Sequence, residues 1–324
     1  MRFVQAASLD SIADYRLLDG APPEPGPGEV RVRVGACGVG YVDALVALGR
    51  YQVKPPLPHV PGQEAAGTVD ALGPGVTGLS VGDRVLGAVR GGFAQCALAR
   101  AEDLARMPDA MSFAQGAGFR INYLTALHGL RDRAALAAGE TLLVLGAAGG
   151  VGAATIQVGK RLGARVVACA SSDEKRAFAA SLGADAVLDT APDGWRDRLK
   201  AACGGTGPDV IMDPVCGPLF EAAFRSLSWR GRHLVVGFVG GPIPKLPANL
   251  SLLKGAGLIG VDVRQFLLYE RALADAHLTQ LLDWVAQGRL APPVGRRFAL
   301  ADFAPALEFA LAGKGLGKTI VEID

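Results

Sequence analysis

Four glycines between positions 146 and 152 could form a binding site for a diphosphate. They lie in the stretch 141–160, TLLVLGAAGGVGAATIQVGK. Gly146 is expected to turn the chain, and Gly149 and Gly150 to let backbone N–H groups approach a pyrophosphate. Gly152 would let a helix pack closely on the preceding strand. A phosphate there would lie at the positive end of the helix dipole, so the predicted ligand is the diphosphate of a dinucleotide.

The elements around this turn predict an α/β domain. Apolar residues 142–145 indicate a strand before it, and apolar residues at helical spacing follow it. Further apolar strands then alternate with helical stretches, at 165–170, 186–188, 209–212, 233–237 and 258–261. This alternation predicts a doubly wound parallel sheet of the Rossmann type, with ligands at the carboxyl ends of the strands.

The residues before this region predict a smaller domain rich in β-strands. Short strands are expected at 29–34, 65–72, 83–89 and 93–98, with Gly/Pro turns between them and a short helix at 42–48. We expect a compact barrel or sandwich over residues 1–121 and the nucleotide-binding domain over 122–262. Residues 263–324 would return to the first domain through a helix near 272–288 and a last strand at 318–323, leaving the active site between the two domains.

Composition narrows the class of protein. The chain has 324 residues, 50% of them hydrophobic and 20% charged, and a net charge of +2. Its basic residues are scattered, so no nucleic-acid or membrane partner is expected. The start of the chain lacks the pattern of a signal peptide, which favours a cytoplasmic location. The five cysteines and four histidines show no disulfide or zinc spacing.

The motifs together resemble the quinone oxidoreductase and zeta-crystallin family of the medium-chain dehydrogenase/reductases. The resemblance lies in the glycine turn with Gln157 and Lys160, in residues 62–69 (GQEAAGTV), in residues 122–126 (NYLTA) and in the closing Gly317-Lys318. It implies a GroES-like β-rich catalytic domain beside the Rossmann domain. It also implies a homodimer paired through the sheet edge near 258–263.

Two positions separate this chain from the zinc-dependent branch of that superfamily. Gly40 and Gln63 stand where that branch has a metal-binding cysteine and histidine, and its cysteine-rich lobe is missing. Glycine has no ligand atom and an amide is a poor zinc ligand, so no metal is expected. Many quinone oxidoreductases carry asparagine at position 40, so Gly40 would leave a wider and less polar pocket. Gln63 and Glu64 are expected to be structural.

The residues after the second strand of the Rossmann domain bear on the choice of cofactor. A carboxylate there would bind the adenosine ribose and repel a 2′-phosphate, but this chain has Ser171 and Ser172, followed by Lys175 and Arg176. Hydroxyls beside cations favour NADPH, with NADH possible. Alternatively, Ser172 only caps a helix. Asp189, where relatives often have a tyrosine near the phosphate, argues against NADPH.

Without a metal, the protein must position an acceptor and stabilise the oxyanion that develops on it. The resemblance makes Tyr51 the first candidate for this role, because several enoyl reductases of the superfamily have a tyrosine there. Tyr41, next to the lost metal site, is the second. Tyr51 could instead only pack on the following prolines. The candidate cofactor-binding residues are Asn122, Thr125, Ala148, Gly149, Gly150, Val151, Ser171, Ser172, Lys175, Val215, Phe238, Gly240 and Lys318.

Three functions follow from these features. The first is a zinc-independent, NADPH-dependent reductase of quinones or related electron-poor carbonyl compounds. The second is a reductase of the double bond of 2-enoyl thioesters or enals. The third is an NADPH-binding structural or RNA-binding protein of the zeta-crystallin type, against which the scattered basic residues argue.

Overall fold

The computed structural model describes all 324 residues and divides them into two compact units. Unit 1 consists of Met1–Ile121 and Leu282–Asp324, and unit 2 of Asn122–Leu281. The return to unit 1 thus begins at Leu282 rather than at residue 263, where the sequence analysis placed it. The reason lies in unit 2, where the ring of Phe266 stacks on His128 with 3.8 Å between centroids. His277 Nε2 also lies 2.8 Å from Asp132 Oδ2.

Unit 2 has the predicted Rossmann architecture. Its six strands follow the order β10-β9-β8-β11-β12-β13, and every neighbouring pair is parallel. The strands are β8 (Thr141–Val144), β9 (Arg165–Cys169), β10 (Ala186–Leu188), β11 (Val210–Asp213), β12 (Arg232–Val235) and β13 (Gly257–Gly260). Each corresponds to an apolar run of the sequence, so this part of the fold prediction is confirmed.

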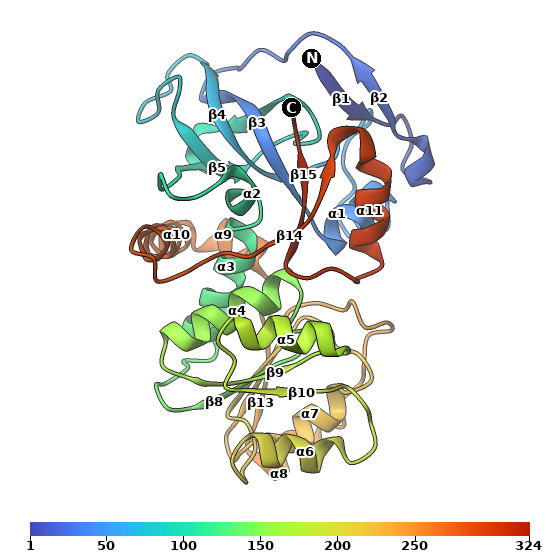
Figure 1. The fold of residues 1–324 in the computed structure, drawn as a ribbon, viewed down its shortest axis with the longest axis vertical. Helices are drawn as coiled ribbons and strands as arrows, with labels where there is room; N and C mark the ends of the chain where they lie inside the picture. Colours follow the sequence, from blue (N-terminus) through green and yellow to red (C-terminus); the bar gives the residue numbers. More distant parts are fainter. The chain divides into compact units, whose positions relative to one another are not determined.

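Helices cover both faces of this sheet. In Figure 1, α4 (Gly150–Arg161) and α5 (Asp173–Ser181) lie on one face, and α6 (Trp195–Ala202), α7 (Phe220–Ser226) and α8 (Asn249–Lys254) lie on the other. The chain enters through α3 (Arg120–Leu127) and a π-helical turn, His128–Arg133, and leaves through α9 (Val263–Tyr269) and α10 (Arg271–Ala286). The crossovers bury both faces of the parallel strands, which explains their continuous apolar sequence.

Unit 1 is built on a seven-stranded sheet. The order is β14-β15-β3-β4-β5-β7, and β6 also pairs with β3. The strands are β3 (Glu29–Val39), β4 (Glu64–Leu72), β5 (Arg84–Ala88), β6 (Cys96–Arg100), β7 (Leu104–Arg106), β14 (Val294–Ala299) and β15 (Lys318–Glu322). A separate ribbon joins β1 (Arg2–Gln5) to β2 (Arg16–Asp19), and the helices are α1 (Tyr41–Ala47), α2 (Phe113–Gly116) and α11 (Phe303–Leu311).

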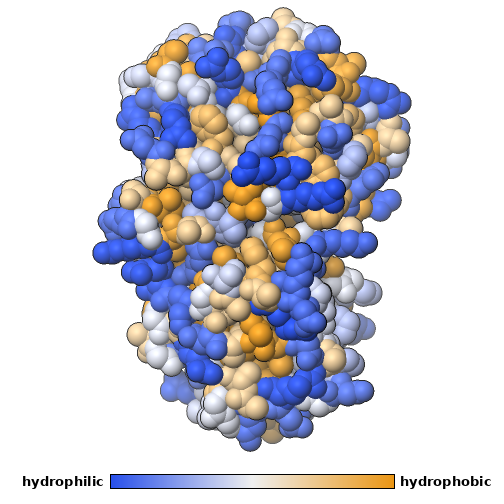
Figure 2. All heavy atoms as spheres, viewed as in Figure 1, coloured by the Kyte–Doolittle hydropathy of each residue, from blue (hydrophilic) through white to orange (hydrophobic).

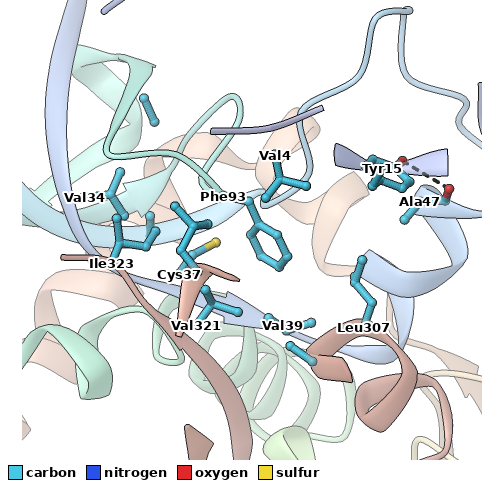
Figure 3. Packing of buried hydrophobic residues seen from close by; sticks show 14 of the residues in the cluster. Val4, Tyr15, Val34, Cys37, Val39, Ala47, Phe93, Leu307, Val321 and Ile323 are labelled. Atoms are coloured by element: carbon cyan, nitrogen blue, oxygen red, sulfur yellow. Dashed lines mark hydrogen bonds between the residues drawn. The ribbon is translucent and has the colours of Figure 1, made fainter. Parts of the chain in front are cut away.

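The last strand of the chain completes this sheet. β15 pairs antiparallel with the end of β3, and Figure 1 shows the red C-terminal strand beside the blue one. Figure 3 shows the core beneath it, where Cys37, Phe93, Leu307 and Val321 pack together. The buried Tyr15 hydroxyl has a hydrogen-bond partner, because it donates to the Ala47 carbonyl at 3.1 Å.

No helix of the chain combines the length and the apolar character needed to cross a membrane. Over the face drawn in Figure 2, hydrophilic and hydrophobic residues are interspersed.

Candidate active site

The glycine turn after β8 has the geometry that the sequence predicts. Gly146 has a φ of +59°, a conformation that glycine adopts without strain. The N–H of Gly149 donates to the Gly146 carbonyl at 3.1 Å, and α4 begins at the next residue. A Cβ at Gly152 would lie 2.3 Å from the Gly146 oxygen. Only glycine at position 152 therefore lets α4 start this close to the turn.

The N-terminus of α4 can hold an anion. N–H groups of its first turn have no carbonyl partner within the helix, and the helix dipole adds positive potential there. Gly149 is exposed at this end, while Ala148 is buried and Val151 half-buried. Gly150 differs from the expectation, because a Cβ there would lie 2.7 Å from Asn122 Nδ2. Its role includes close packing of the Asn122 amide, which the structure thereby brings to the candidate site.

Other candidates lie at the ends of β11 and β12. The N–H of Gly240 donates to the Val215 carbonyl at 2.8 Å, so the loop after β12 rests on the loop after β11. A Cβ at Gly240 would lie 2.6 Å from Gly217 Cα, so this contact also requires glycine. Phe238, in the same loop, is 41% exposed. Thr125 is buried on α3.

Asp213, at the end of β11, fixes these loops and was not singled out from the sequence. Its Oδ1 accepts hydrogen bonds from the N–H groups of Val215 at 2.9 Å and Cys216 at 2.8 Å. Its Oδ2 lies 3.0 Å from His233 Nε2, and both side chains are fully buried. An aspartate ending an otherwise apolar strand was the available signal, because a buried carboxylate needs partners.

The segment after β9 carries the residues expected to select the cofactor. The Ser172 hydroxyl caps α5 by accepting from the Lys175 N–H at 3.3 Å, so the capping role predicted as an alternative is present. Ser171 is exposed beside it. Arg176 Nη1 donates to the Ala170 carbonyl at 3.1 Å, which holds its guanidinium at the end of β9.

Asp189 is less of an obstacle to a phosphate than the sequence suggests. Its Oδ1 accepts from the Ala191 N–H at 2.8 Å and pairs with Arg198 Nη2 at 2.8 Å. The backbone hydrogen bond, followed by Arg198, holds the pKa of Asp189 below its usual value. Its charge is therefore already matched within the chain.

Tyr41, Tyr51 and Lys318 lie in unit 1, whereas the other candidate residues belong to unit 2. Tyr41 is the first residue of α1, and Tyr51 lies in the bend that follows this helix. Both side chains are partly exposed, and their hydroxyls make no hydrogen bond within the chain. Each phenol is thus free to donate to a ligand.

Lys318 lies beside Gly40, where a wider and less polar pocket was expected. A Cβ at Gly40 would lie 3.1 Å from Lys318 Nζ, and one at Gly38 would lie 2.9 Å from Lys318 Cε. The ammonium is 3.8 Å from Asp43 Oδ2, which accepts from the Gly40 N–H at 2.7 Å. An ion pair between Lys318 and Asp43 therefore lies beside Gly40.

Glu64 is the buried member of this polar group. Its Oε1 accepts from the Ile121 N–H at 3.2 Å, while its Oε2 is buried without a hydrogen-bond partner. Burial raises the pKa of Glu64 to about 7, although the positive charge of Lys318 opposes this rise. Glu64 is therefore expected to be partly protonated near neutral pH. A charged residue opening the apolar strand β4 was the only sequence signal for it.

Gln63, at the other position of a zinc ligand, is exposed. No group of three or more histidine, cysteine, aspartate or glutamate side chains is placed to hold a metal ion.

Comparison with known proteins agrees with both the fold and the motifs. Residues 26–126 match the alcohol dehydrogenase GroES-like domain, and residues 150–285 match the zinc-binding dehydrogenase family. Quinone oxidoreductase-like protein 2 of Rattus norvegicus is 35% identical over 99% of this chain and 93% of its own length. The quinone oxidoreductase of the same species is 33% identical over 92% of this chain and 90% of its own.

Solved structures share the whole architecture. A mycobacterial protein complexed with NADPH is 31% identical and covers 99% of this chain and 100% of its own, with a TM-score of 0.90. Escherichia coli quinone oxidoreductase complexed with NADPH is 25% identical, with the same coverages and a TM-score of 0.90. An enoyl reductase, CurK, is 24% identical with a TM-score of 0.89 over 100% of this chain and 99% of its own, a likeness that shows the fold alone.

Sequence identity over nearly the whole chain, the two matched domains and the shared glycine turn lead to one assignment. The chain belongs to the quinone oxidoreductase family of the medium-chain dehydrogenase/reductase superfamily and is an oxidoreductase.

Proposed function

We propose that this protein is an NADPH-dependent, zinc-independent reductase of quinones or related electron-poor carbonyl compounds. The observation that carries the proposal is the glycine cradle at the N-terminus of α4, which fits a diphosphate. Two relatives of the same fold were solved with NADPH, and two others bear the name of quinone oxidoreductases or of proteins like them.

In this proposal, residues of unit 2 bind the cofactor and a tyrosine of unit 1 contacts the acceptor. The first turn of α4 binds the diphosphate, and the loops of Val215 and Gly240 orient the nicotinamide end of the cofactor. Bound NADPH supplies a hydride. Tyr51 or Tyr41 donates a hydrogen bond to the acceptor oxygen, where negative charge develops, and can supply a proton to it.

The cations after β9 favour NADPH over NADH. Lys175 lies one helical turn from the capping hydroxyl of Ser172, and Arg176 is held at the strand end by the Ala170 carbonyl. Together they would offer hydroxyls and cations to a 2′-phosphate, with Arg176 also paired to Asp173. The pairing of Asp189 with Arg198 supports this preference, because it leaves less negative charge to repel the phosphate.

Replacing Lys175 by alanine tests this preference. We expect Lys175→Ala to weaken NADPH binding about tenfold, since a charge-assisted hydrogen bond to a phosphate is worth about 1.4 kcal/mol or more. Binding of NADH should change less than about twofold, because NADH lacks the 2′-phosphate. Fluorescence titration of both nucleotides measures this ratio. Equal weakening of the two would contradict the role given to Lys175.

The reaction itself is tested by anaerobic consumption of NADPH with three acceptors offered side by side: a simple quinone, an enal and a 2-enoyl thioester. Turnover of the quinone alone supports the proposal. Tyr51→Phe and Tyr41→Phe, which remove only a hydroxyl, should be compared with wild type. If one of these tyrosines contacts the acceptor, replacing it by phenylalanine should lower kcat about tenfold or more. Failure to consume NADPH with any acceptor would argue against the proposal.

Reduction of enoyl thioesters or enals remains the second candidate, favoured by the free hydroxyl of Tyr51. This reaction needs a proton delivered beside the reduced carbon, and a phenol can deliver it. Turnover of the thioester that is lost in Tyr51→Phe, with no turnover of the quinone, would establish it instead.

We also propose that the protein is a homodimer joined through β13. This strand is the edge of the sheet in unit 2 and pairs only with β12. Large apolar side chains are exposed around it, with Trp229 71%, Leu252 81% and Leu258 44% accessible. An open apolar edge is a template for pairing with a second copy. Light scattering at micromolar concentration should give the mass of a dimer, and Leu258→Arg should give the mass of a monomer.

A further inference from the structure

A cavity of about 740 Å³ lies in unit 2, and none of its lining residues is among those assigned above to the cofactor. It is lined by residues of α6 between Trp195 and Lys200 and the turn before them, by the end of α7, by Lys254 at the end of α8, and by the loop 205–207 that leads to β11. Its size is that of pockets which bind small metabolites.

Cations dominate the walls of this cavity. Arg196 and Lys200 are one helical turn apart on α6, and Arg225 and Lys254 line it from α7 and α8. Asp197 is the only carboxylate among the lining residues. Arg225 is paired with Glu221 at 2.7 Å, so the charges that remain are those of Arg196, Lys200 and Lys254 against Asp197. Like charges at this helical spacing destabilise a helix unless an anion lies between them.

The heads of two of these cations are positioned by backbone carbonyls rather than by carboxylates. Lys254 Nζ donates to the Leu227 carbonyl at 2.8 Å, and Arg196 Nη2 donates to the Arg225 carbonyl at 3.3 Å. These contacts place both side chains at the C-terminal end of α7, where the helix dipole offsets part of their charge, and neither side chain pairs with a carboxylate. Burial, followed by the positive charge of Arg196, lowers the pKa of Lys254.

The loop opposite these side chains brings backbone and a hydroxyl to the same cavity. Gly204 and Gly205 have φ values of +79° and +98°, and no atom lies within 4 Å of a Cβ built on either. Glycine at these two positions therefore allows the backbone conformation of the loop and is not required by close packing. Gly207 packs tightly, since a Cβ there would lie 1.9 Å from the Ser226 oxygen. Thr206 lies between them on the cavity wall.

We propose that this cavity binds a small organic phosphate at a site separate from the dinucleotide site. Its cations supply charge-assisted hydrogen bonds to a phosphate group, and its volume leaves room for the rest of a small molecule. The proposal does not depend on the proposed reaction, because it uses none of the same residues.

Isothermal titration of the full-length protein with inorganic phosphate and with glucose 6-phosphate tests the site, with glucose as the uncharged comparison. The titrations are run with and without saturating NADP⁺, so that phosphate binding at α4 is blocked in one arm. We expect both phosphates to bind in the presence of NADP⁺ and glucose not to bind.

Variants of the cavity give the decisive comparison. Lys200→Gln, which alters an exposed side chain, should weaken phosphate binding about tenfold, and Asp197→Asn should strengthen it about threefold. Arg161→Gln is the control, because Arg161 is an exposed cation of α4 that makes no ion pair. It should change the affinity less than about twofold.

Two results would overturn the proposal. One is the absence of binding with NADP⁺ present, and the other is equal weakening in Lys200→Gln and Arg161→Gln. If NADP⁺ itself fails to bind, the proposed function fails, and the comparison of the variants still decides whether the cavity binds phosphate.

Discussion

Glu64→Gln is expected to gain about 3 kcal/mol of stability relative to wild type when the pH is raised from 4.5 to 8. Glu64 has an ordinary pKa of 4.5, which burial raises to about 7 in the folded protein. Between these values the folded state holds a proton that the unfolded state has released. Wild-type stability therefore falls as the pH rises through this window, whereas glutamine cannot ionise.

The change with pH, rather than the stability at one pH, is the informative quantity. Glutamine can keep the hydrogen bond from the Ile121 N–H, and its amide N–H₂ takes the place of the unpartnered Oε2, so any constant cost cancels in the comparison. Urea unfolding at several pH values measures how the stability difference between wild type and Glu64→Gln changes with pH. Hydrogen exchange in peptides of unit 1 assigns this change to the unit that contains Glu64.

Glu140→Gln is a control of opposite sign. Arg232 pairs with Glu140 at 2.7 Å and, as the largest cause, lowers the pKa of Glu140. Wild type should therefore gain stability relative to this variant as the pH rises through the acidic range. If Glu64→Gln showed no pH-dependent difference from wild type, the Glu64 carboxyl would have the same pKa in the folded and unfolded protein, and burial would not raise it.

Asp213→Ala is expected to destabilise unit 2 by about 3–5 kcal/mol, because removing one partner of a buried pair leaves the other without compensation. His233 would lose its partner in a site that is fully buried. The N–H groups of Val215 and Cys216 would lose their acceptor as well. The loop that carries Val215 would loosen, so NADPH binding should weaken in the same variant.

Asp213→Asn separates these two effects. An asparagine oxygen can still accept from both N–H groups, so this variant should keep the loop and lose less stability than alanine. Asp193→Ala, at an exposed aspartate of the same unit, is the control and should stay within about 0.5 kcal/mol of wild type. Urea unfolding and nucleotide titration measure both quantities. Equal losses in Asp213→Ala and Asp193→Ala would contradict the argument.

The parts of the structure that rest on local pattern could be predicted from the sequence. The conformation of Gly146 and the close contact of Gly152 follow from a strand, a turn and a helix that are adjacent in the chain. The parallel strands follow from short apolar runs, because their burial on both faces leaves a continuous signal. The strands β1, β2, β7 and β14 escaped prediction because each has at most one buried residue and so leaves no apolar run.

What the sequence could not reveal depends on contacts between distant residues. The meeting of Lys318 with Asp43 near Gly40 needs β15 to pair with β3, and nothing near either residue indicates this pairing. The same is true of Asp213 and His233, which lie on neighbouring strands. The cations of the cavity in unit 2 also come from separate helices, so no sequence motif predicts that they lie together.

The pairing of β15 with β3 has a consequence for synthesis of the protein. β3 is translated before unit 2, whereas β15, which pairs with residues 36–39 of β3, is translated after it. Until then this edge of the nascent sheet stays open, and Asp43 lacks the cation it pairs with in the finished protein. A chain interrupted before Lys318 lacks the ion pair beside Gly40. β15 must therefore be translated before this part of the candidate site exists.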